Sequence, residues 1–348
     1  MQMDKSKPVC VTGATGYVAG WIVKRLLDEG FTVHAAVRQP DNKDKTRHLD
    51  ALAENAPGSI KYFQADLLEE GSYKAAIEGC GVVFHTASPF TRNVDNPQRD
   101  LIDPAVEGTR NVLETVNETP SVSRVVLTSS CAAIYGDNAD LEKTKNGRFT
   151  EEDWNMTSSV DHNPYSYSKT MAEKKAWQIA ETQDRWKMVV VNPSFVMGPG
   201  INPNATSESF TVMTQMGDGT MKMGGPDFRI GVIDVRDLAD AHMAAAFVPD
   251  AQGRHIISAH DTGFLEIADI LNKHFPEYPL PKRAMPKWLL WLIAPAVGMT
   301  RKEVSRTVGR PWHADNSKSK QELGMSYRPL EETAVEFFQQ MADNGRFD

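Results

Sequence analysis

The sequence predicts an α/β protein: a doubly wound parallel sheet with a smaller, interleaved lobe of mixed α/β structure. Through the first half of the chain, short apolar runs alternate with amphipathic segments, which is typical of strand and helix units in a parallel sheet. After Pro193 the composition changes to Gly, Pro, Asn and Met, which is typical of loops that leave a sheet. A length of 348 residues suits one large domain with a lobe added to it.

The apolar runs are predicted to be strands, and the amphipathic segments between them are predicted to be helices. In the first helical segment, Val18, Ile22 and Leu26 lie on one face. Lys24 lies on the opposite face, and Gly30 is well placed to end the helix. The predicted strands are 9–12, 31–37, 60–64, 82–84, 124–128 and 188–191, and the predicted helices are 17–29, 73–78, 105–117 and 164–182.

The second half is predicted to leave the sheet and return to it. Segments 198–204 and 213–225 are predicted to be loops, whereas 235–248 is predicted to be a helix and 254–259 a strand. The boundary between domain and lobe is therefore interleaved. We expect a first domain over 1–197, to which 231–260 returns, and a second lobe built from 198–230 and 261–348.

The charge and cysteine content exclude several classes of protein. With 38 basic and 46 acidic residues the net charge is −8, so nucleic acid is not expected as a partner. Cys10, Cys80 and Cys131 are widely spaced, which argues against a disulfide framework and against a metal site. No apolar signal core precedes the first strand, so we expect a cytoplasmic protein.

One segment, 288–295, is apolar enough to suggest a membrane. It is far shorter than the roughly 20 residues that span a bilayer, so no membrane span is expected. We expect this segment to be buried in a core or at an interface between monomers, and contact with a membrane surface is the alternative. Whether the chain is a monomer or a homodimer stays open.

A glycine-rich turn follows the first predicted strand and opens the first predicted helix, in the run Thr12-Gly-Ala-Thr-Gly-Tyr-Val-Ala-Gly20. Gly13 permits the tight turn, and Gly16 lets the backbone approach a pyrophosphate, whose charge the helix amides stabilise. Ala19, followed by Gly20, keeps the helix close to the strand. The turn predicts a dinucleotide site, and the first domain is then a Rossmann domain.

The residues after the second strand favour NADP over NAD. Arg38 stands where NAD enzymes usually carry an acid, and Lys45 follows it, so the two can bind a 2′-phosphate. Asp41 lies close by and leaves dual specificity open. Asp66 and Leu67, at the end of the third strand, are expected at the adenine end of the cofactor.

Tyr165 and Lys169 stand four residues apart and so share one face of the helix that begins near Pro164. We expect the lysine cation to favour the ionised phenol and so to lower the pKa of Tyr165. Tyr165 is then a general acid for carbonyl reduction and a base in the reverse reaction. Ser130, at the end of the fifth strand, is expected to orient the reacting oxygen, whereas strand alternation sends the rival Ser129 the other way.

In this order, the glycine turn, Arg38, His85-Thr-Ala-Ser-Pro89, Thr128-Ser-Ser130, the Tyr165 and Lys169 pair and Asn192-Pro193 resemble the extended short-chain dehydrogenase/reductases. Within them the chain is most similar, over about 9–341, to the dihydroflavonol 4-reductase and cinnamoyl-CoA reductase branch. The resemblance implies a reversible NADPH-dependent carbonyl reductase with Ser130, Tyr165 and Lys169 as catalytic residues. The expected contacts to NADP(H) are Gly13, Thr15, Gly16, Tyr17, Val18, Arg38, Lys45, Asp66, Leu67, Thr86, Ala87, Ser88, Ser130, Tyr165, Lys169, Pro193, Val196 and Ser207.

The chain departs from this family at two positions. Plant flavonoid reductases carry an asparagine five positions after the catalytic serine, where this chain has Tyr135, so flavonoid specificity is not expected. Many short-chain enzymes have an asparagine that holds a proton-relay water, where this chain has Ala105. Resupply of the proton therefore needs another path or bulk solvent.

The substrate is expected between the sheet and the second lobe. Phe90, Tyr135, Phe210 and Met213 are the candidate substrate residues. The methionines at 213, 216, 221 and 223 are either an adaptable apolar lid or part of a core. The candidate cations for a charged substrate are Arg92, Lys222 and Arg229, and His85 is interpreted as a structural histidine because no second metal ligand stands near it.

Two other functions stay open on this scaffold. A sugar-nucleotide epimerase or dehydratase, or a hydroxysteroid dehydrogenase, would use the same nucleotide domain. A regulator that senses NADP without turnover is the third possibility, but it has no need for the Tyr165 and Lys169 pair.

Overall fold

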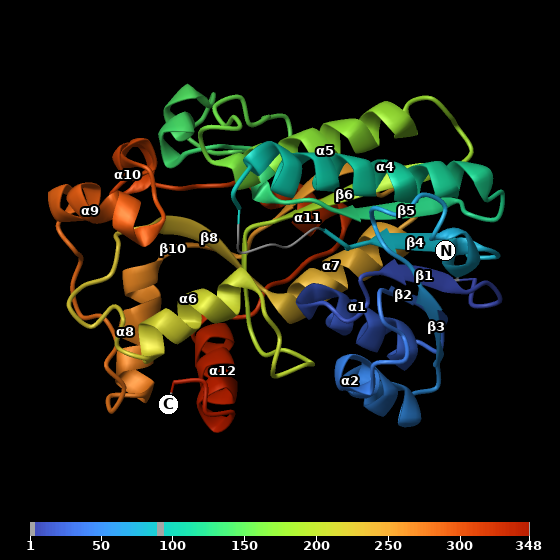
Figure 1. Cartoon of the computed structure of the whole chain (residues 1–348), viewed down its shortest axis with the longest axis horizontal. Coiled ribbons are helices and arrows are strands. Elements are labelled where there is room, and N and C mark those ends of the chain that lie inside the picture. Colours follow the sequence, from blue (N-terminus) through green and yellow to red (C-terminus); the bar gives the residue numbers. More distant parts are fainter. Residues whose placement is uncertain (1–3, 89–93, 348) are drawn as a thin grey trace.

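The computed structural model describes residues 4–88 and 94–347, and in this part of the chain a seven-stranded parallel sheet forms the centre (Figure 1). The strands lie in the order β3-β2-β1-β4-β5-β6-β9. The chain therefore starts in the middle of the sheet, winds to one edge and then to the other, which confirms the predicted doubly wound α/β fold. The strands are β1 (Val9–Thr12), β2 (Thr32–Val37), β3 (Ser59–Gln64), β4 (Val82–His85), β5 (Arg124–Thr128), β6 (Lys187–Pro193) and β9 (Gly253–Ile257).

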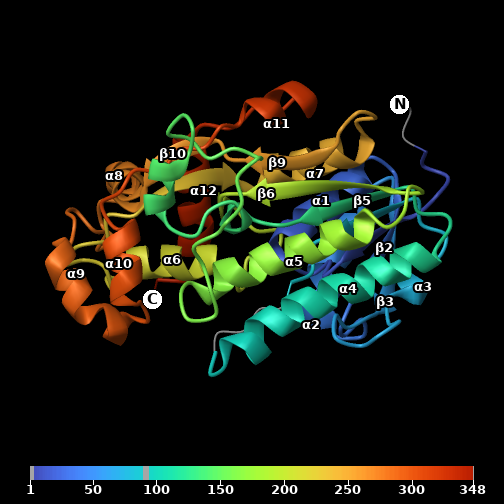
Figure 2. The ribbon, with the colours of Figure 1, turned by 90° about the horizontal axis from the view of Figure 1, so that it is seen from above.

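Helices cover both faces of this sheet. Val9 and Val11 of β1 point to one face and pack with α1 and α7, whereas Cys10 points to the other and packs with α4 and α5. The two layers are separate in Figure 1, and Figure 2 shows α4 and α5 side by side. Because both faces are covered, the strands are apolar on both sides. The helices of these layers are α1 (Tyr17–Asp28), α2 (Lys43–Glu54), α3 (Lys74–Ile77), α4 (Asp103–Glu118), α5 (Pro164–Ala180) and α7 (Val235–Phe247).

A second, smaller sheet of three described strands lies beside the first. Strand β7 (Phe195–Met197) is parallel to β8 (Arg229–Asp234), and β10 (His260–Gly263) is antiparallel to β8. Its core includes Phe210, Met213 and Phe338 from the neighbouring helices. These helices are α6 (Glu208–Gly217), α8 (Phe264–His274) and α12 (Leu330–Asp343).

The remaining short helices lie at the ends of the molecule and in its connections. The α-helices are α9 (Lys287–Ile293), α10 (Arg301–Thr307) and α11 (Ser317–Glu322). A π-helical turn, Gln98–Ile102, precedes α4, and 3-10 helices cover Cys131–Ala133, Asn138–Lys143 and Ala294–Val297.

The predicted elements of the large sheet lie within about two residues of the observed ones. Helix α2 was not predicted, because its sequence is mostly polar and buries only Thr46 and Leu49. The predicted loop 213–225 is wrong at its start, because α6 runs to Gly217 and buries Met213 and Met216 in the lobe core. The division at 197, 230 and 260 stays a prediction.

The apolar segment 288–295 forms α9 and the start of the following 3-10 helix. Leu290 and Ala294 are buried, but Trp288 and Leu292 are exposed. Burial of the whole segment in the core of one chain is therefore wrong, because the helix presents only one side to the protein. Burial at an interface between monomers stays a prediction. In the described ranges, no helix has both the length and the apolar content to cross a bilayer.

Candidate active site

A cavity of about 770 Å³ opens where β1 to β4 end, and the loop before α6 lines it from the lobe. Carboxyl ends of parallel strands are where doubly wound folds bind ligands. The structure also brings to this cavity residues that the sequence did not single out, among them Arg47, Tyr73, Asn202 and Asn204. The predicted cofactor residues on its wall are Gly13, Thr15, Gly16, Tyr17, Arg38, Lys45, Asp66, Leu67, Thr86, Ala87, Ser88 and Ser207.

The glycine turn connects β1 to α1 at one side of the cavity. Gly13 has a φ of +62°, and a Cβ built there would lie 3.1 Å from the Cα and Cβ of Ala87, so a side chain is strained. Gly16 caps α1 without any side-chain acceptor for the first amides of the helix. These amides and the positive end of the helix dipole make this turn an anion site.

Thr12 holds the turn against the end of β4. Its hydroxyl oxygen accepts hydrogen bonds from the amides of Thr86 (3.1 Å) and Ala87 (3.0 Å) and lies 3.0 Å from Nδ1 of His85. Burial lowers the pKa of His85 to about 3, so this histidine is neutral at physiological pH. Across the described segments, no group of three or more His, Cys, Asp and Glu is arranged to hold a metal ion.

Three cations face the cavity near the end of β2. Arg38 and Lys45 are joined there by Arg47, which α2 presents from its first half. Asp44 also lines the cavity, whereas Asp41 does not. Arg47 was missed because α2 was not predicted, and a helical spacing applied to residues 43–54 is the signal that could have found it.

The opposite wall carries a buried hydroxyl without a partner. Ser207 lies at the start of α6, and its Oγ is buried with no hydrogen bond in the described structure. A buried hydroxyl without a partner costs free energy, so this atom is suited to a ligand that supplies one. Asp66 lines the cavity with Leu67, and its Oδ1 accepts a hydrogen bond from the amide of Leu68 (2.9 Å).

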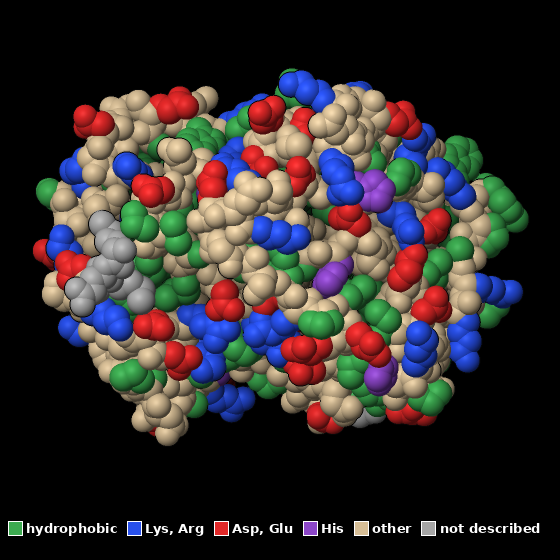
Figure 3. Space-filling model, turned by 180° about the vertical axis from the view of Figure 1, so that it is seen from behind, with side chains coloured by type: hydrophobic (Ala, Val, Ile, Leu, Met, Phe, Trp, Pro, Cys, Tyr) green, Lys and Arg blue, Asp and Glu red, His purple; other side chains and the backbone are tan. Residues whose placement is uncertain are grey.

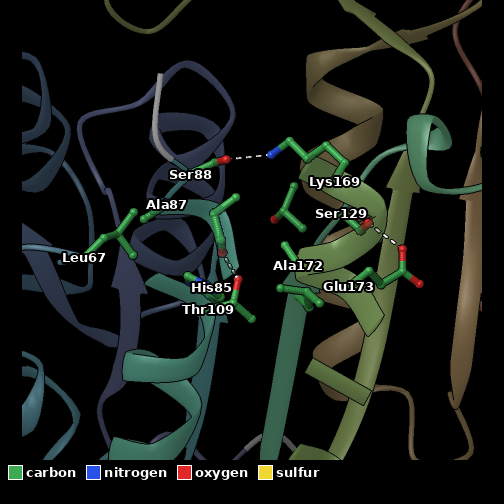
Figure 4. A pocket seen from close by; sticks show the side chains of 12 residues that line it. Leu67, His85, Ala87, Ser88, Thr109, Ser129, Lys169, Ala172 and Glu173 are labelled. Atoms are coloured by element: carbon green, nitrogen blue, oxygen red, sulfur yellow. Dashed lines mark hydrogen bonds between the residues drawn. The ribbon is translucent and has the colours of Figure 1, made fainter. Parts of the chain in front are cut away.

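Helix α5 brings Lys169 of the predicted catalytic pair to Ser88 at the wall of the large cavity. Asn163 is left-handed (φ 54°) and its side chain caps the helix, which starts at Pro164. Lys169 donates a hydrogen bond from Nζ to Ser88 Oγ (2.7 Å), as Figure 4 shows, and the same Nζ lies 5.7 Å from the centre of the Tyr165 ring. Both residues therefore lie on one helical face, and Lys169 reaches the wall of the large cavity.

The predicted direction of the Tyr165 pKa is wrong for the chain alone. Tyr165 is 51% exposed, but desolvation by the protein atoms around it still raises this pKa above its ordinary value. Glu208 adds to the rise, and a hydrogen bond with Ser130 opposes it. The ammonium of Lys169 lies over the ring and donates to Ser88, so it is not directed at the hydroxyl. Burial also lowers the pKa of Lys169, to about 8.

Ser130 and Ser129 point in different directions, as strand alternation predicts. Ser130 caps the 3-10 helix Cys131–Ala133, its Oγ accepting a hydrogen bond from the amide of Ala132 (3.1 Å). Ser129 instead donates to Oε2 of Glu173 (2.5 Å) on α5. Ser130 is thus the hydroxyl associated with Tyr165, and Ser129 belongs to the attachment of α5.

Glu173 is the centre of a buried polar network that the sequence did not reveal. Its carboxylate is 1% exposed and accepts hydrogen bonds from Arg254 Nε (2.6 Å), Asn192 Nδ2 (2.8 Å), Ser129 and Trp177. Asn192 Nδ2 also donates to the carbonyl of Ser130 (3.1 Å). The network ties α5 to β6, β9 and the end of β5. The feature of the sequence that could have revealed this network is Glu173 itself, a glutamate one helical turn after Lys169.

A smaller cavity of about 20 Å³ lies beside Lys169 (Figure 4). Ala105, Thr109 and Thr128 line it together with Lys169 and Ser88. This volume is enough for one water molecule. The small side chain at position 105 leaves this room open.

Other predicted residues lie elsewhere. Val18, Pro193, Val196, Ser130 and Tyr165 line neither of these two cavities. Val18 and Val196 pack against the core of the large sheet, and Pro193 ends β6. Their contact with a cofactor stays a prediction.

The candidate substrate residues are not brought together. Phe210 and Met213 are 3% and 2% exposed in the core of the small lobe and line neither of the two cavities described above, so their contact with a substrate stays a prediction. Both are buried because α6 turns this face toward α12. Tyr135 stacks on Phe149 (4.7 Å between ring centres), and Phe90 lies outside the described residues.

The structure also shows where some of the candidate substrate cations and lid methionines lie. Arg229 forms an ion pair with Glu266, Lys222 is exposed, and Arg92 lies outside the described residues. Of the four methionines, Met223 is the exposed one (69%) and Met213 is in the core. The buried methionines therefore belong to the core, and the lid interpretation does not apply to them.

The comparisons with known proteins agree with this architecture. The model of the NAD dependent epimerase/dehydratase family matches residues 9–258. The chain is 38% identical over 281 residues to cinnamoyl-CoA reductase CAD2 of Medicago truncatula, covering 79% of this chain and 83% of that protein. It is 34% identical over 285 residues to an anthocyanidin reductase of Vitis vinifera, covering 79% and 83%.

A solved structure matches nearly the whole chain. It is the yeast methylglyoxal/isovaleraldehyde reductase Gre2 complexed with NADPH, at a TM-score of 0.77 and 30% identity. The match covers 97% of this chain and 99% of Gre2.

Proposed function

The chain belongs to the NAD-dependent epimerase/dehydratase family and is an NAD(P)-dependent reductase within it, and from this premise we propose that it reduces an aldehyde or ketone to the alcohol with NADPH. The observation that carries the proposal is the position of α5. This helix holds Tyr165 and Lys169 on one face, beside Ser88 at the wall of the large cavity.

The large cavity fits a dinucleotide with an extra phosphate. It has the volume of a cofactor site, a glycine turn at the N-terminus of α1, and a buried Ser207 hydroxyl without a partner. Arg38, Lys45 and Arg47 would hold the 2′-phosphate, because all three are exposed cations that line the same cavity and can pair with an anion there. Bound NADPH supplies the hydride.

Tyr165 supplies the proton in this proposal. Since its surroundings raise the pKa of Tyr165, the phenol is protonated at neutral pH and can donate to the oxygen of a carbonyl. Ser130, which hydrogen-bonds with Tyr165, orients the same oxygen and stabilises its developing charge.

Lys169 would hold the ribose next to the nicotinamide, and it would resupply the proton of Tyr165 once its ammonium turns from Ser88 towards the hydroxyl. The cavity of about 20 Å³ gives water access to its ammonium between Ala105 and Thr109. This is the path that replaces the missing relay asparagine. A cytoplasmic location, and a monomeric or homodimeric state, remain predictions of the sequence.

Purified protein mixed with NADPH and a panel of small, aromatic and flavonoid carbonyls tests the proposal. We expect loss of the absorbance of the reduced nicotinamide, and Tyr165→Phe should lower kcat by about 10²- to 10⁴-fold because the general acid is lost. Tyr167→Phe is the matched control, because residues two apart do not share a helical face.

Equal rates for wild type and Tyr165→Phe on every substrate of the panel would refute the assignment. A tightly bound nucleotide that survives purification, together with no net oxidation or reduction, would favour the epimerase or dehydratase alternative. Binding of NADP without any turnover would favour the regulator.

A further inference from the structure

Helix α9 and the 3-10 helix after it carry an apolar stripe on their outer side. Trp288, Trp291 and Leu292 are 66%, 39% and 52% exposed, and Val297 is 53% exposed. The first three are spaced i, i+3 and i+4, so they share one helical face. In Figure 3 hydrophobic side chains gather at the right edge, which is the end of the molecule that carries α9 in Figure 1.

The inner side of α9 explains why the helix stays in place. Leu290 and Ala294 are buried and pack with Val304 and Val308 of the α10 region. The helix is thus anchored by one face while its other face is left to solvent. Isolated exposed apolar residues are ordinary, but a stripe of two tryptophans and a leucine on one helix marks an interaction site.

The charged residues in segment 278–302, which contains this stripe, are all basic, and the acids near it include Glu303, directly after it, and Asp227, near Lys287. Residues 278–302 contain no Asp or Glu, whereas the chain as a whole has a net charge of −8. Within the part of the chain that the structure describes, none of the basic residues in this segment forms an ion pair. They are Lys282, Arg283, Lys287, Arg301 and Lys302.

Arg301 connects the cationic and apolar parts of this surface. Its guanidinium lies 4.5 Å from the centre of the Trp291 ring. Lys282 and Lys302 are exposed, and Lys287 is tied to backbone carbonyls, donating to those of Ser305 and Val308. The surface therefore combines tryptophan rings with a surplus of positive charge.

We propose that α9 docks the protein on an anionic lipid membrane as a peripheral, non-spanning contact. Tryptophan rings suit the headgroup level of a bilayer, and basic residues beside an apolar stripe are attracted by anionic lipids. The helix has seven residues, so it lies in the interface and does not cross it. A symmetric pairing of two copies through this stripe would bring the cations of both together, so the charges disfavour it.

Co-sedimentation of the full-length protein with vesicles tests the proposal. We expect binding to vesicles of phosphatidylcholine mixed with phosphatidylserine, weaker binding to phosphatidylcholine alone, and loss of binding as salt rises, because salt screens exposed charges. Trp288→Ser combined with Leu292→Ser should weaken partition by about tenfold or more, since two exposed apolar groups leave the bilayer.

Matched variants distinguish binding through this surface from nonspecific adsorption of the protein to vesicles. Lys282→Glu combined with Lys302→Glu should remove the preference for phosphatidylserine. Met156→Ser and Lys145→Glu, at residues that are 79% and 91% exposed outside this segment, should bind as wild type does. Unchanged thermal unfolding and unchanged carbonyl reduction show that the α9 variants are folded.

Two results would overturn the proposal. One is an absence of binding to both kinds of vesicle. The other is binding that the α9 variants and the control variants reduce equally. If vesicles are not bound and ultracentrifugation shows dimers that Trp288→Ser with Leu292→Ser dissociates, the stripe belongs to a second copy of the chain and membrane docking is wrong.

Discussion

The ammonium of Lys169 is partly desolvated by the protein atoms around it, although its hydrogen bond with Ser88 is exposed. Its pKa falls to about 8 from an ordinary value of 10.5 as a result. Between these two pH values the unfolded chain binds a proton that the folded chain has released, so stability rises with pH through this window. Below this pH window both the folded and the unfolded chain are protonated, so the folded state carries the full free-energy cost of desolvating the cation.

Lys169→Met removes this titration. We expect the variant to gain most stability over wild type at neutral pH, at most about 3 kcal/mol, because one pKa unit is worth about 1.4 kcal/mol. The gain should shrink as pH rises from about 8 towards 10.5. Thermal unfolding of both proteins across this range checks it, and a difference that does not vary with pH would contradict the assigned burial.

Arg47 is the cation that the structure adds to the expected phosphate site. Arg47→Ala should raise KM for NADPH by roughly tenfold or more and leave KM for NADH nearly unchanged, since a hydrogen bond to a charged group is worth about 1.5–3 kcal/mol. Steady-state kinetics with both cofactors measures this. Lys43→Ala is the control on the same helix, because Lys43 is 73% exposed and pairs with Asp50. Equal changes for the two cofactors would remove Arg47 from the phosphate site.

At the scale of elements, α5 depends on the network around Glu173. Glu173→Gln leaves the buried guanidinium of Arg254 without its carboxylate, and we expect a loss of about 3–5 kcal/mol in the free energy of unfolding. We also expect kcat to fall more than KM for NADPH, because Glu173 and Asn192 position the end of β5 at Ser130 without lining the large cavity.

The double variant separates positioning from simple destabilisation. Glu173→Gln with Arg254→Gln removes both charges, so it should recover part of the stability that Glu173→Gln loses. Denaturant unfolding and kinetics at a temperature where both variants are folded give the two readouts. If kcat follows stability in every variant and KM changes in step, Glu173 has no separate positioning role.

At the scale of the whole molecule, the large cavity is lined both by the large sheet and by the segment that leads into the small lobe. Its walls come from β1 to β4 and from 202–207, and Tyr17 of α1 donates a hydrogen bond to the carbonyl of Gly198 (2.5 Å) and packs against Phe210. A ligand in this cavity therefore contacts both parts of the fold. The proposed division into 1–197 with 231–260, and 198–230 with 261–348, implies a joint at this place.

We expect NADPH to raise the unfolding temperature of the whole protein in a single transition. A ligand at about a hundred times its Kd adds about 2.7 kcal/mol to the native state. NADH at the same concentration should add less, because it lacks the phosphate for Arg38 and Lys45. Scanning calorimetry with each cofactor checks both statements, and a transition that splits into a stabilised and an unchanged part would show that the cofactor contacts only one of the two parts.

The sequence by itself determined the sheet, the glycine turn and the Tyr165 and Lys169 pair, because strands, turns and helical faces follow from local periodicity and spacing. Ser130 was separated from Ser129 by strand alternation alone. These features depend on neighbours within a few residues along the chain, so they can be read without coordinates.

Only the tertiary structure decided how distant residues meet. It placed Arg47 at the cavity, joined Glu173 to Arg254, turned Phe210 and Met213 into a core, and left one side of α9 exposed. It also reversed the expected direction of the Tyr165 pKa. Burial and desolvation depend on which segments pack together, and that information is spread over contacts between residues far apart in the sequence.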